Sequence, residues 1–313
     1  MKTDITRLID NLNEENIVKI LEADSADYLF EIVRTRFHYK KIRVVPILEI
    51  SNNCDKNCLY CGIRRDSEVK RYSMTIDEIL NECKKLRNLG FYHIHIQAGD
   101  SLELRRQIIS IVRRIHGETG MTVALSIGPL DENEIIELEH YGLRGILIRF
   151  ETSNRELFDK INPEKDFDSI ISTINFAKKH GLKIATGFQI GLPGEDMITL
   201  AKDILFTTSL DASVIGVGPF IPTLGTPFQD KNRPFGFDVA ERVVSLLRLL
   251  NKDALIPATT AYDAIVEKGV DLSQLPNRSR LLHEAGANII MLSVTPQKYR
   301  DQYFLYTNKD KVI

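Results

Sequence analysis

The sequence lacks tryptophan altogether, holds only four cysteines among 313 residues and carries a formal net charge of −2. A nearly neutral chain does not offer the basic surface that nucleic acids or anionic membranes attract. It also lacks an apolar run long enough to cross a bilayer, which takes ~20 residues. The first residues lead into polar sequence without the apolar core of a signal peptide. We therefore expect a cytoplasmic protein with no nucleic-acid and no membrane partner.

Short apolar runs alternate with longer amphipathic segments from residue 44 onward. The runs cover residues 44–50, 92–97, 121–126, 145–151, 183–190, 213–218, 253–259 and 287–293. The segments with helical spacing cover residues 75–89, 102–116, 132–141, 167–180, 197–209, 239–250 and 275–284. Such alternation is typical of parallel strands joined by crossover helices, and eight units fit a closed barrel.

The predicted fold is therefore an α/β protein, a (β/α)8 TIM-type barrel with a short N-terminal helical segment. Helical spacing over residues 1–40 predicts that residues 1–43 form this segment and pack on the barrel of residues 44–313, within one structural domain. An open parallel sheet of the same elements is the alternative architecture.

Three of the four cysteines, Cys54, Cys58 and Cys61, lie in one loop with the spacing C-x3-C-x2-C. Cysteine thiolates are the usual ligands of iron–sulfur clusters, and three of them leave one iron of a [4Fe–4S] cluster open. An open coordination position is typical of a catalytic metal centre. The alternative is a zinc-stabilised binding protein, but structural zinc takes four ligands and the fourth cysteine, Cys83, falls in a helical pattern.

Further polar residues follow the predicted strands at the end where barrel enzymes carry their active sites. Gly99 and Asp100 form a turn after the second run. Thr259 and Thr260 end the seventh run, and Tyr299 and Arg300 follow the eighth, where they could cover the barrel mouth or simply lie on the surface.

Arg149 and Glu151 share one face of the fourth run, because side chains alternate along a strand. Ile148 and Phe150 take the other face, which packs outward against helices. The two charged side chains then point into the barrel, where an unpaired charge is costly. Either they form a plain ion pair, or both meet a ligand, with the guanidinium of Arg149 gripping a carboxylate.

The cysteine loop, C-D-K-N-C-L-Y-C-G, resembles the cluster loop of the radical S-adenosylmethionine (SAM) enzymes. The resemblance implies that Cys54, Cys58 and Cys61 hold a [4Fe–4S] cluster whose open iron chelates SAM. One electron then cleaves SAM to a 5′-deoxyadenosyl radical that attacks the substrate. It implies that Tyr60 lies near the adenine and that Glu151 meets the ribose hydroxyls. The remaining expected cofactor-binding residues are Gln97, Gly99, Asp100, Ser126 and Ile190. The expected substrate-binding residues are Arg149, Thr259, Thr260, Tyr299 and Arg300. Of these, Arg149 is also the expected catalytic residue.

Several further stretches resemble one subgroup, the HydE-type maturases of [FeFe]-hydrogenase, which are relatives of biotin synthase and methylornithine synthase. They include G-V-G-P-F-I-P at 216–222 and I-P-A-T-T-A at 256–261, together with residues 54–65, 71–75, 149–152, 187–194, 226–227, 286–288 and 295–303. This resemblance implies an anaerobic enzyme of hydrogenase maturation with an organometallic or other small-molecule substrate. It also implies an electron donor such as a ferredoxin or flavodoxin, and other hydrogenase maturases as partners.

Two positions depart from the pattern of that subgroup. The turn after the second run is short, since Ser101 leads straight into Leu102. Ile170 stands about where the subgroup tends to carry an arginine directed toward the SAM carboxylate. These differences leave room for an alternative, a radical SAM enzyme that acts on an amino acid or small metabolite, similar to methylornithine synthase. Biotin synthase itself needs more cysteines for a second cluster.

Overall fold

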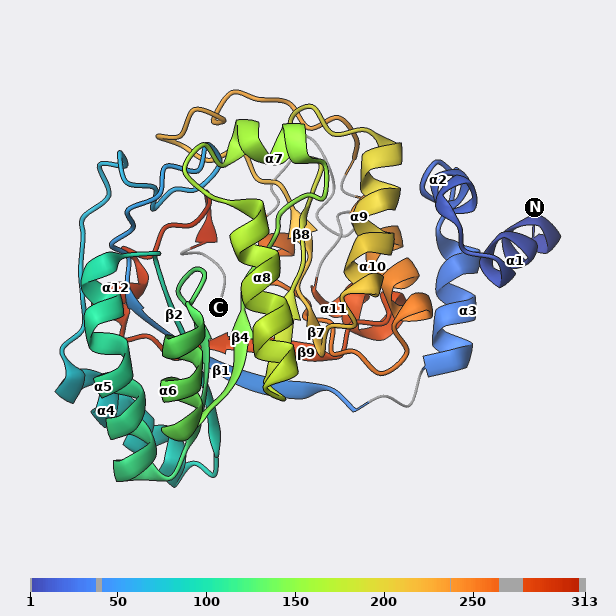
Figure 1. Cartoon of the computed structure of the whole chain (residues 1–313). Helices are drawn as coiled ribbons and strands as arrows, with labels where there is room; N and C mark the ends of the chain where they lie inside the picture. The colour runs from blue at the N-terminus through green and yellow to red at the C-terminus, as the bar shows by residue number, and fades with distance from the viewer. Residues whose placement is uncertain (1, 38–40, 237, 265–277, 310–313) are drawn as a thin grey trace.

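Parallel strands form a curled sheet surrounded by helices in a computed structural model that describes residues 2–37, 41–236, 238–264 and 278–309 (Figure 1). The sheet has seven strands in the order β7-β5-β4-β3-β2-β1-β9, and every neighbouring pair is parallel. The strands are β1 (Arg43–Ser51), β2 (His93–Ala98), β3 (Thr122–Ser126), β4 (Leu143–Leu147), β5 (Lys183–Thr186), β7 (Val214–Ile215) and β9 (Ile289–Ser293). Two short strands, β6 (Gln189–Ile190) and β8 (Gly218–Pro219), pair separately above them.

The seventh apolar run closes the ring between the two edge strands. Parallel bridges join Val214 to Leu255 on one side and Pro257 to Ile289 on the other. The amide of Ile215 donates to the carbonyl of Leu255 at 2.8 Å, and the amide of Ala258 donates to the carbonyl of Ile289 at 2.9 Å. All eight predicted runs therefore take part in one ring, and the predicted barrel class is confirmed. The seventh contributes isolated bridges instead of a regular strand.

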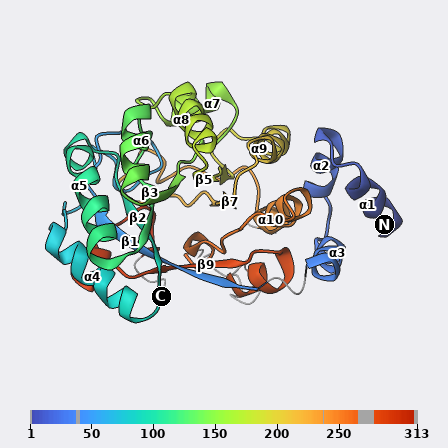
Figure 2. The same ribbon diagram turned by 60° about the horizontal axis from the view of Figure 1, so that its bottom comes forward.

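Helices follow the strands and form the outer layer, as the alternating pattern predicts (Figures 1 and 2). Thr75 and Glu78 form a reciprocal capping box at the start of α4, and Asp131 and Glu134 do the same for α6, which satisfies amides that a helix leaves unpaired. The last predicted helix begins at residues 275–277, which lie outside the described residues. The helices are α4 (Ile76–Asn88), α5 (Leu102–Thr119), α6 (Glu132–His140), α7 (Arg155–Ile161), α8 (Phe167–Lys179), α9 (Met197–Ser209), α10 (Asp238–Leu250), η1 (Thr260–Tyr262), α11 (Arg278–Arg280), the π-helix η3 (Leu281–Ala285) and α12 (Gln297–Arg300).

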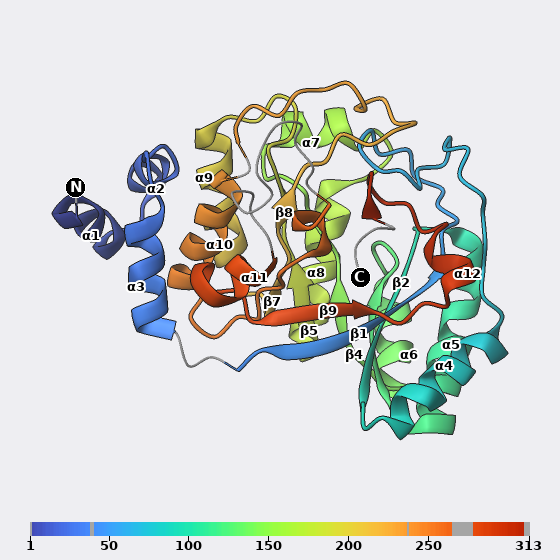
Figure 3. The same cartoon turned by 180° about the vertical axis from the view of Figure 1, so that it is seen from behind.

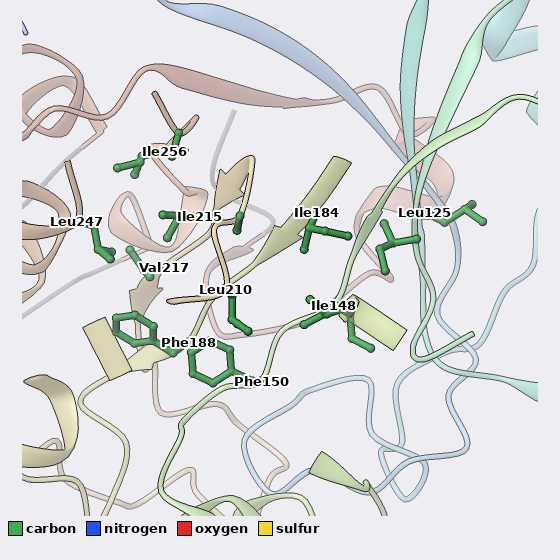
Figure 4. Close-up of a cluster of buried hydrophobic side chains, with 14 of the residues drawn as sticks. Leu125, Ile148, Phe150, Ile184, Phe188, Leu210, Ile215, Val217, Leu247 and Ile256 are labelled. Carbon is green, nitrogen blue, oxygen red and sulfur yellow. The ribbon is translucent and has the colours of Figure 1, made fainter. Parts of the chain in front are cut away.

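The apolar core lies between the strands and these helices (Figure 4). Ile148 and Phe150 belong to it, as the alternation along the fourth run predicts. The ring of Phe150 meets Phe206 of α9 edge-to-face, with centroids 5.1 Å apart. Because the outward face of this strand packs against helices, the polar side chains at the strand end point into the barrel.

Three N-terminal helices, α1 (Lys2–Asp10), α2 (Glu14–Leu21) and α3 (Asp27–Phe37), lie beside α9 and α10 (Figures 2 and 3). Helix α2 contacts α9 and α10, and α3 contacts α10 and η3. The guanidinium of Arg242 in α10 donates to the carbonyl of Leu21 at 2.8 Å, which caps the end of α2. Among the described helices, none is both long and apolar enough to span a membrane.

Candidate active site

The loop of Cys54, Cys58 and Cys61 follows β1 at the carboxyl end of the barrel strands. Cys58 is buried, whereas Cys54 and Cys61 are half-buried. The side chain of Arg71 organises the loop, because its two terminal nitrogens donate to five backbone carbonyls. These acceptors are Asn52, Ile63, Arg64, Arg65 and Ser67. The motif spacing identifies the cysteines but does not predict the hydrogen bonds that the Arg71 guanidinium makes to the loop.

The turn at Gly99 packs directly against the cysteine loop. A Cβ atom at Gly99 would lie 2.2 Å from the carbonyl oxygen of Asn53 and 2.8 Å from Cβ of Cys54, so only glycine fits. The amide of Asp55 donates to the carbonyl of Asp100 at 2.7 Å, and the carboxylate of Asp55 accepts from the amide of Leu102 at 2.8 Å. The predicted turn is thus part of the wall that shapes the cluster loop.

The three thiols influence one another electrostatically. Burial, and then the neighbouring Cys58, raise the pKa of Cys61 to about 12. Burial also raises the pKa of Cys54, although hydrogen bonds from the backbone of Lys56 and Asp100 act in the opposite direction. Bound iron would hold these thiols deprotonated, since a metal-bound thiol loses its proton. Backbone amides on the sulfur, which favour the thiolate, fit a loop that holds a cluster.

The three thiols are not gathered around a single point. Within the described part of the chain, no group of three or more His, Cys, Asp or Glu side chains is placed to hold one metal ion. Cysteines that bind a [4Fe–4S] cluster each bind a different iron, so they need to surround a volume and do not converge on one ion.

Arg149 and Glu151 lie together, as predicted, with Nη2 of the guanidinium 3.1 Å from Oε2 of the carboxylate. Burial, followed by the charge of Glu151, raises the pKa of the Tyr60 phenol, so Tyr60 belongs to the same site. The Glu151 carboxylate also accepts a hydrogen bond from Gln189 at 3.2 Å. Its backbone has φ of 63°, a left-handed conformation that is costly for a residue other than glycine.

Asp203 of α9 fixes the chain just after Glu151. Its Oδ1 atom accepts hydrogen bonds from the amide and hydroxyl of Ser153 and from the hydroxyl of Thr152. Burial raises the pKa of this carboxyl to about 6. These bonds hold the turn in which the strained Glu151 backbone lies. Asp203 is far from this turn in sequence, and no motif marks it.

Deeper in the barrel, a second ion pair joins β1 to the C-terminal part of the chain. Glu49 accepts from Lys309 at 3.0 Å and from the hydroxyl of Ser293 at 2.6 Å. The predicted cofactor residue Gln97 lies beside Glu49 in the register of β1 and β2, and it shares a hydrogen bond with the phenol of Tyr303. Half-buried Ser126 continues the row, because it pairs with Gln97 in the ladder of β2 and β3.

The other predicted residues lie at several places around the ring. Thr259 donates to the carbonyl of Val217 at 3.3 Å, and Thr260 bonds to the phenol of Tyr306. Tyr299 donates to Glu78 of α4 at 2.8 Å, and the guanidinium of Arg300 donates to the carbonyl of Thr295 after β9. Ile190 is buried in the core, as is Cys83 within α4. The role of each of these residues in ligand binding stays a prediction.

Sequence reasoning missed one cation near the cysteines. Lys165 lies between α7 and α8 and is half-buried. The charges of Cys58, Glu151, Cys61 and Cys54 raise its pKa even though burial, the largest single effect, lowers it. The sequence around Lys165 shows no motif that predicts a functional role. The charged residues that surround it in space come from distant parts of the chain, so only the fold reveals them.

A family model of the radical SAM superfamily matches residues 48–206, which include the cysteine loop, Gly99, Arg149 and Glu151. The chain belongs to the radical SAM superfamily. It is therefore an enzyme that uses a [4Fe–4S] cluster and SAM. The three thiols of the cysteine loop are the donor type that binds such a cluster.

Radical SAM relatives match nearly the whole length of the chain. It is 33% identical to the [FeFe] hydrogenase maturase subunit HydE of Thermotoga maritima, over 90% of this chain and 78% of the relative. It is 25% identical to 3-methylornithine synthase of Methanosarcina acetivorans, over 92% of this chain and 77% of the relative. The crystal structure of methylornithine synthase (PylB) superimposes with a TM-score of 0.78 at 22% identity, covering 92% of this chain and 85% of that one, which supports the radical SAM barrel fold.

Proposed function

We propose that this radical SAM enzyme works in the assembly of the [FeFe]-hydrogenase active-site cluster, as a HydE-type maturase. The identity of 33% to a HydE subunit over 90% of the chain supports this substrate class over the more distant relatives. The observation that carries the proposal within the site is the state of Arg149. Its Nε and Nη2 atoms are buried, and neither has a hydrogen-bond acceptor among the described residues.

Buried guanidinium nitrogens without a hydrogen-bond acceptor are costly, so they indicate a ligand group that completes them. A guanidinium presents a planar fork of donors that matches a carboxylate. We therefore assign Arg149 to the carboxylate of the substrate and Glu151 to the ribose hydroxyls of SAM. When bound, the cluster and SAM supply a one-electron reductive cleavage of SAM. The protein's own residues orient the two ligands relative to each other.

A second function, the conversion of an amino acid or small metabolite, is favoured by the polar interior of the barrel. Glu49 and Lys309, together with Arg149, offer charges of both signs to a ligand that carries both an amine and a carboxylate. His95 of β2 adds a buried imidazole whose Nε2 has no partner among the described residues. Burial lowers its pKa to about 4, so it is neutral at pH 7.

A cell-free hydrogenase maturation mixture from which the HydE component has been withheld tests the proposal. The reconstituted protein should restore hydrogen production by the apo-hydrogenase, and its Cys54→Ser variant should not. If the protein cleaves SAM with reductant but restores no hydrogenase activity, the maturase role is wrong. The same preparation incubated with an amino-acid mixture, followed by mass spectrometry, then tests the second function.

The partners proposed with this function are an electron donor such as a ferredoxin or flavodoxin and other hydrogenase maturases. Both would be met in the cytoplasm. The maturation mixture also tests these partners, because omission of the donor or of the other maturases should abolish the restored activity.

A further inference from the structure

Glu49 is a buried anion on the inner face of β1. Leu48 and Ile50 belong to the apolar core between the strands and the helices, so Glu49 between them points into the barrel. Its side chain is 5% exposed, and its carboxylate lies 3.0 Å from the ammonium of Lys309, which is 12% exposed. Although burial, the largest single effect, raises the pKa of Glu49, the charge of Lys309 and hydrogen bonds from two hydroxyls leave it below its ordinary value. Glu49 is therefore ionised at neutral pH and needs a cation beside it.

The two oxygens of this carboxylate are held in different ways. Oε2 accepts a hydrogen bond from the hydroxyl of Ser293 at 2.6 Å and another from the hydroxyl of Thr295. Thr295 also accepts from the backbone amide of Glu49 at 2.8 Å, so the carboxylate and its backbone are fixed together. Oε1 accepts one hydrogen bond among the described residues, from Lys309. A fixed acceptor whose remaining oxygen has a single, exchangeable donor is a preorganised site for an ammonium group.

That donor belongs to a segment, residues 302–309, which crosses the carboxyl end of the barrel and forms no strand of the sheet. The amide of Gly62 in the cysteine loop donates to the carbonyl of Leu305 at 3.0 Å. Further along, the phenol of Tyr306 is hydrogen-bonded to Thr260, a predicted substrate-binding residue. The segment therefore extends from the cysteine loop to the predicted substrate site, across the space where a substrate would meet the cofactor.

A second group with an incomplete set of hydrogen bonds lies next to this carboxylate. Ile94 and Ile96 belong to the apolar core, so His95 between them points into the barrel as well. It pairs with Ile47 in the ladder of β1 and β2, and is thus one strand repeat deeper than Glu49. It is 4% exposed, and its Nε2 has no partner among the described residues. A neutral imidazole protonated at Nδ1 offers Nε2 as an acceptor, and an ammonium group has three donors to share.

We propose that the Glu49 carboxylate binds a primary ammonium group of the substrate, and that the ammonium of Lys309 occupies this position until the substrate displaces it. The exchange replaces one cation by another, so the buried carboxylate is never left without a partner. The ligand takes the space that the lysine side chain leaves. The inference deepens the proposed function and rests on it, because a substrate held by both Arg149 and Glu49 carries a carboxylate and a primary ammonium. An amino acid, free or as part of a larger substrate, has both groups.

n-Propylammonium chloride probes the site without the true substrate, because it replaces the part of the lysine side chain that Lys309→Ala removes. This variant should bind the probe with a millimolar Kd by calorimetry, and the probe should raise its melting temperature. The wild type should bind the probe about 10-fold more weakly or worse, because its tethered ammonium competes at an effective concentration in the millimolar range. The double variant Glu49→Gln/Lys309→Ala should not bind it.

The matched control is Lys298→Ala, which removes a lysine that pairs with Glu78 at the surface and should behave as the wild type does. If Lys309→Ala binds the probe no more tightly than this control, Glu49 does not accept a free ammonium and the inference is wrong. In the wild type, saturating n-propylammonium should speed amide hydrogen exchange over residues 302–309 relative to an equal concentration of sodium chloride. Unchanged exchange would contradict displacement, whether or not Lys309→Ala folds.

Turnover connects the site to the substrate. In whichever of the two assays above shows turnover, Glu49→Gln should lose about 100-fold in rate while uncoupled SAM cleavage persists. Lys309→Ala should instead lower the KM for the substrate several-fold, because its competitor is gone. An equal loss of turnover in both variants would show that the ion pair is structural. The probe measurements need neither the maturation partners nor turnover, so they can fail while the maturase role holds, and the reverse is also true.

Discussion

Arg149 and Glu151 lie 3.1 Å apart between guanidinium and carboxylate, yet the contact is not aligned as a hydrogen bond. The carboxylate instead accepts from Gln189, and the guanidinium keeps two buried nitrogens without an acceptor among the described residues. A plain ion pair, the simpler of the two interpretations from the sequence, accounts for the proximity of the two charges. It does not account for the unsatisfied nitrogens, which a bound carboxylate would pair.

Arg149→Lys should keep the fold, the cluster and SAM binding but severely impair turnover of the true substrate. Lysine retains the charge but cannot reproduce the two parallel hydrogen bonds of the guanidinium. A substrate displaced by about 1 Å can lose on the order of 100-fold in rate. Uncoupled SAM cleavage under reductant should persist. A large fall in melting temperature, with activity lost only in proportion to folded protein, would instead support a structural ion pair.

Glu151→Ala should weaken SAM binding by about 1.5–3 kcal/mol, the scale of a hydrogen bond to a charged group, while the cluster survives. Calorimetry on the reconstituted protein measures this loss. Glu156→Ala, in the exposed first turn of α7, is the matched control. Unchanged SAM affinity would leave Glu151 with a structural role only. Because Glu151 adopts φ of 63°, Glu151→Gly should lose affinity to the same extent without adding backbone strain.

Each of the variants Cys54→Ser, Cys58→Ser and Cys61→Ser should lose most of the iron, whereas Cys83→Ala should retain it. Cys83 is fully buried in α4, and burial raises its pKa to about 12, so its thiol is protonated and enclosed by apolar side chains. Iron analysis and the absorption spectrum after anaerobic reconstitution measure the outcome. Loss of iron in Cys83→Ala would refute the three-cysteine assignment.

Asp203→Asn should stabilise the protein at neutral pH and have no effect in acid. Burial raises the pKa of Asp203 from 3.8 to about 6, so the folded protein binds this proton more tightly than the unfolded chain. Its contribution to the free energy of unfolding is therefore greatest below the unfolded pKa and falls as the pH rises through about 6. Asparagine keeps the accepting Oδ1 atom and replaces Oδ2, which has no partner among the described residues.

The expected gain for this variant is about 1–3 kcal/mol above pH 7, since one pKa unit corresponds to about 1.4 kcal/mol. Urea unfolding at several pH values measures it, with the exposed Asp159→Asn in α7 as the control. A difference between variant and wild type that is the same at pH 4 and pH 8 would show that the Asp203 carboxyl does not titrate as described.

The sequence predicts the parts of this molecule that depend on local periodicity and on motif spacing. The eight apolar runs, the three cysteines and the shared face of Arg149 and Glu151 are examples. Lys165 and Asp203 could not be found in this way, because the charges that surround Lys165 and the hydrogen-bond partners of Asp203 come from residues far away in the chain. The left-handed backbone of Glu151 is likewise held by tertiary hydrogen bonds. The sequence does not predict it, because the residue is neither glycine nor asparagine.

The closure of the barrel by isolated bridges has a consequence for its dynamics. Regular ladders of hydrogen bonds connect β1 with β2, β2 with β3, and β3 with β4. This half of the ring carries the cysteine loop, the Gly99 turn and the strand that leads to Glu151. Residues 255–257 have a single bridge on each side, next to the predicted substrate residues Thr259 and Thr260. Amide hydrogens at this seam should exchange with solvent faster than those of β1–β4, because fewer ladder bonds must open. The half of the ring that carries the predicted cofactor residues should therefore be the more rigid one, while the wall at Thr259 and Thr260 should adapt its shape more readily.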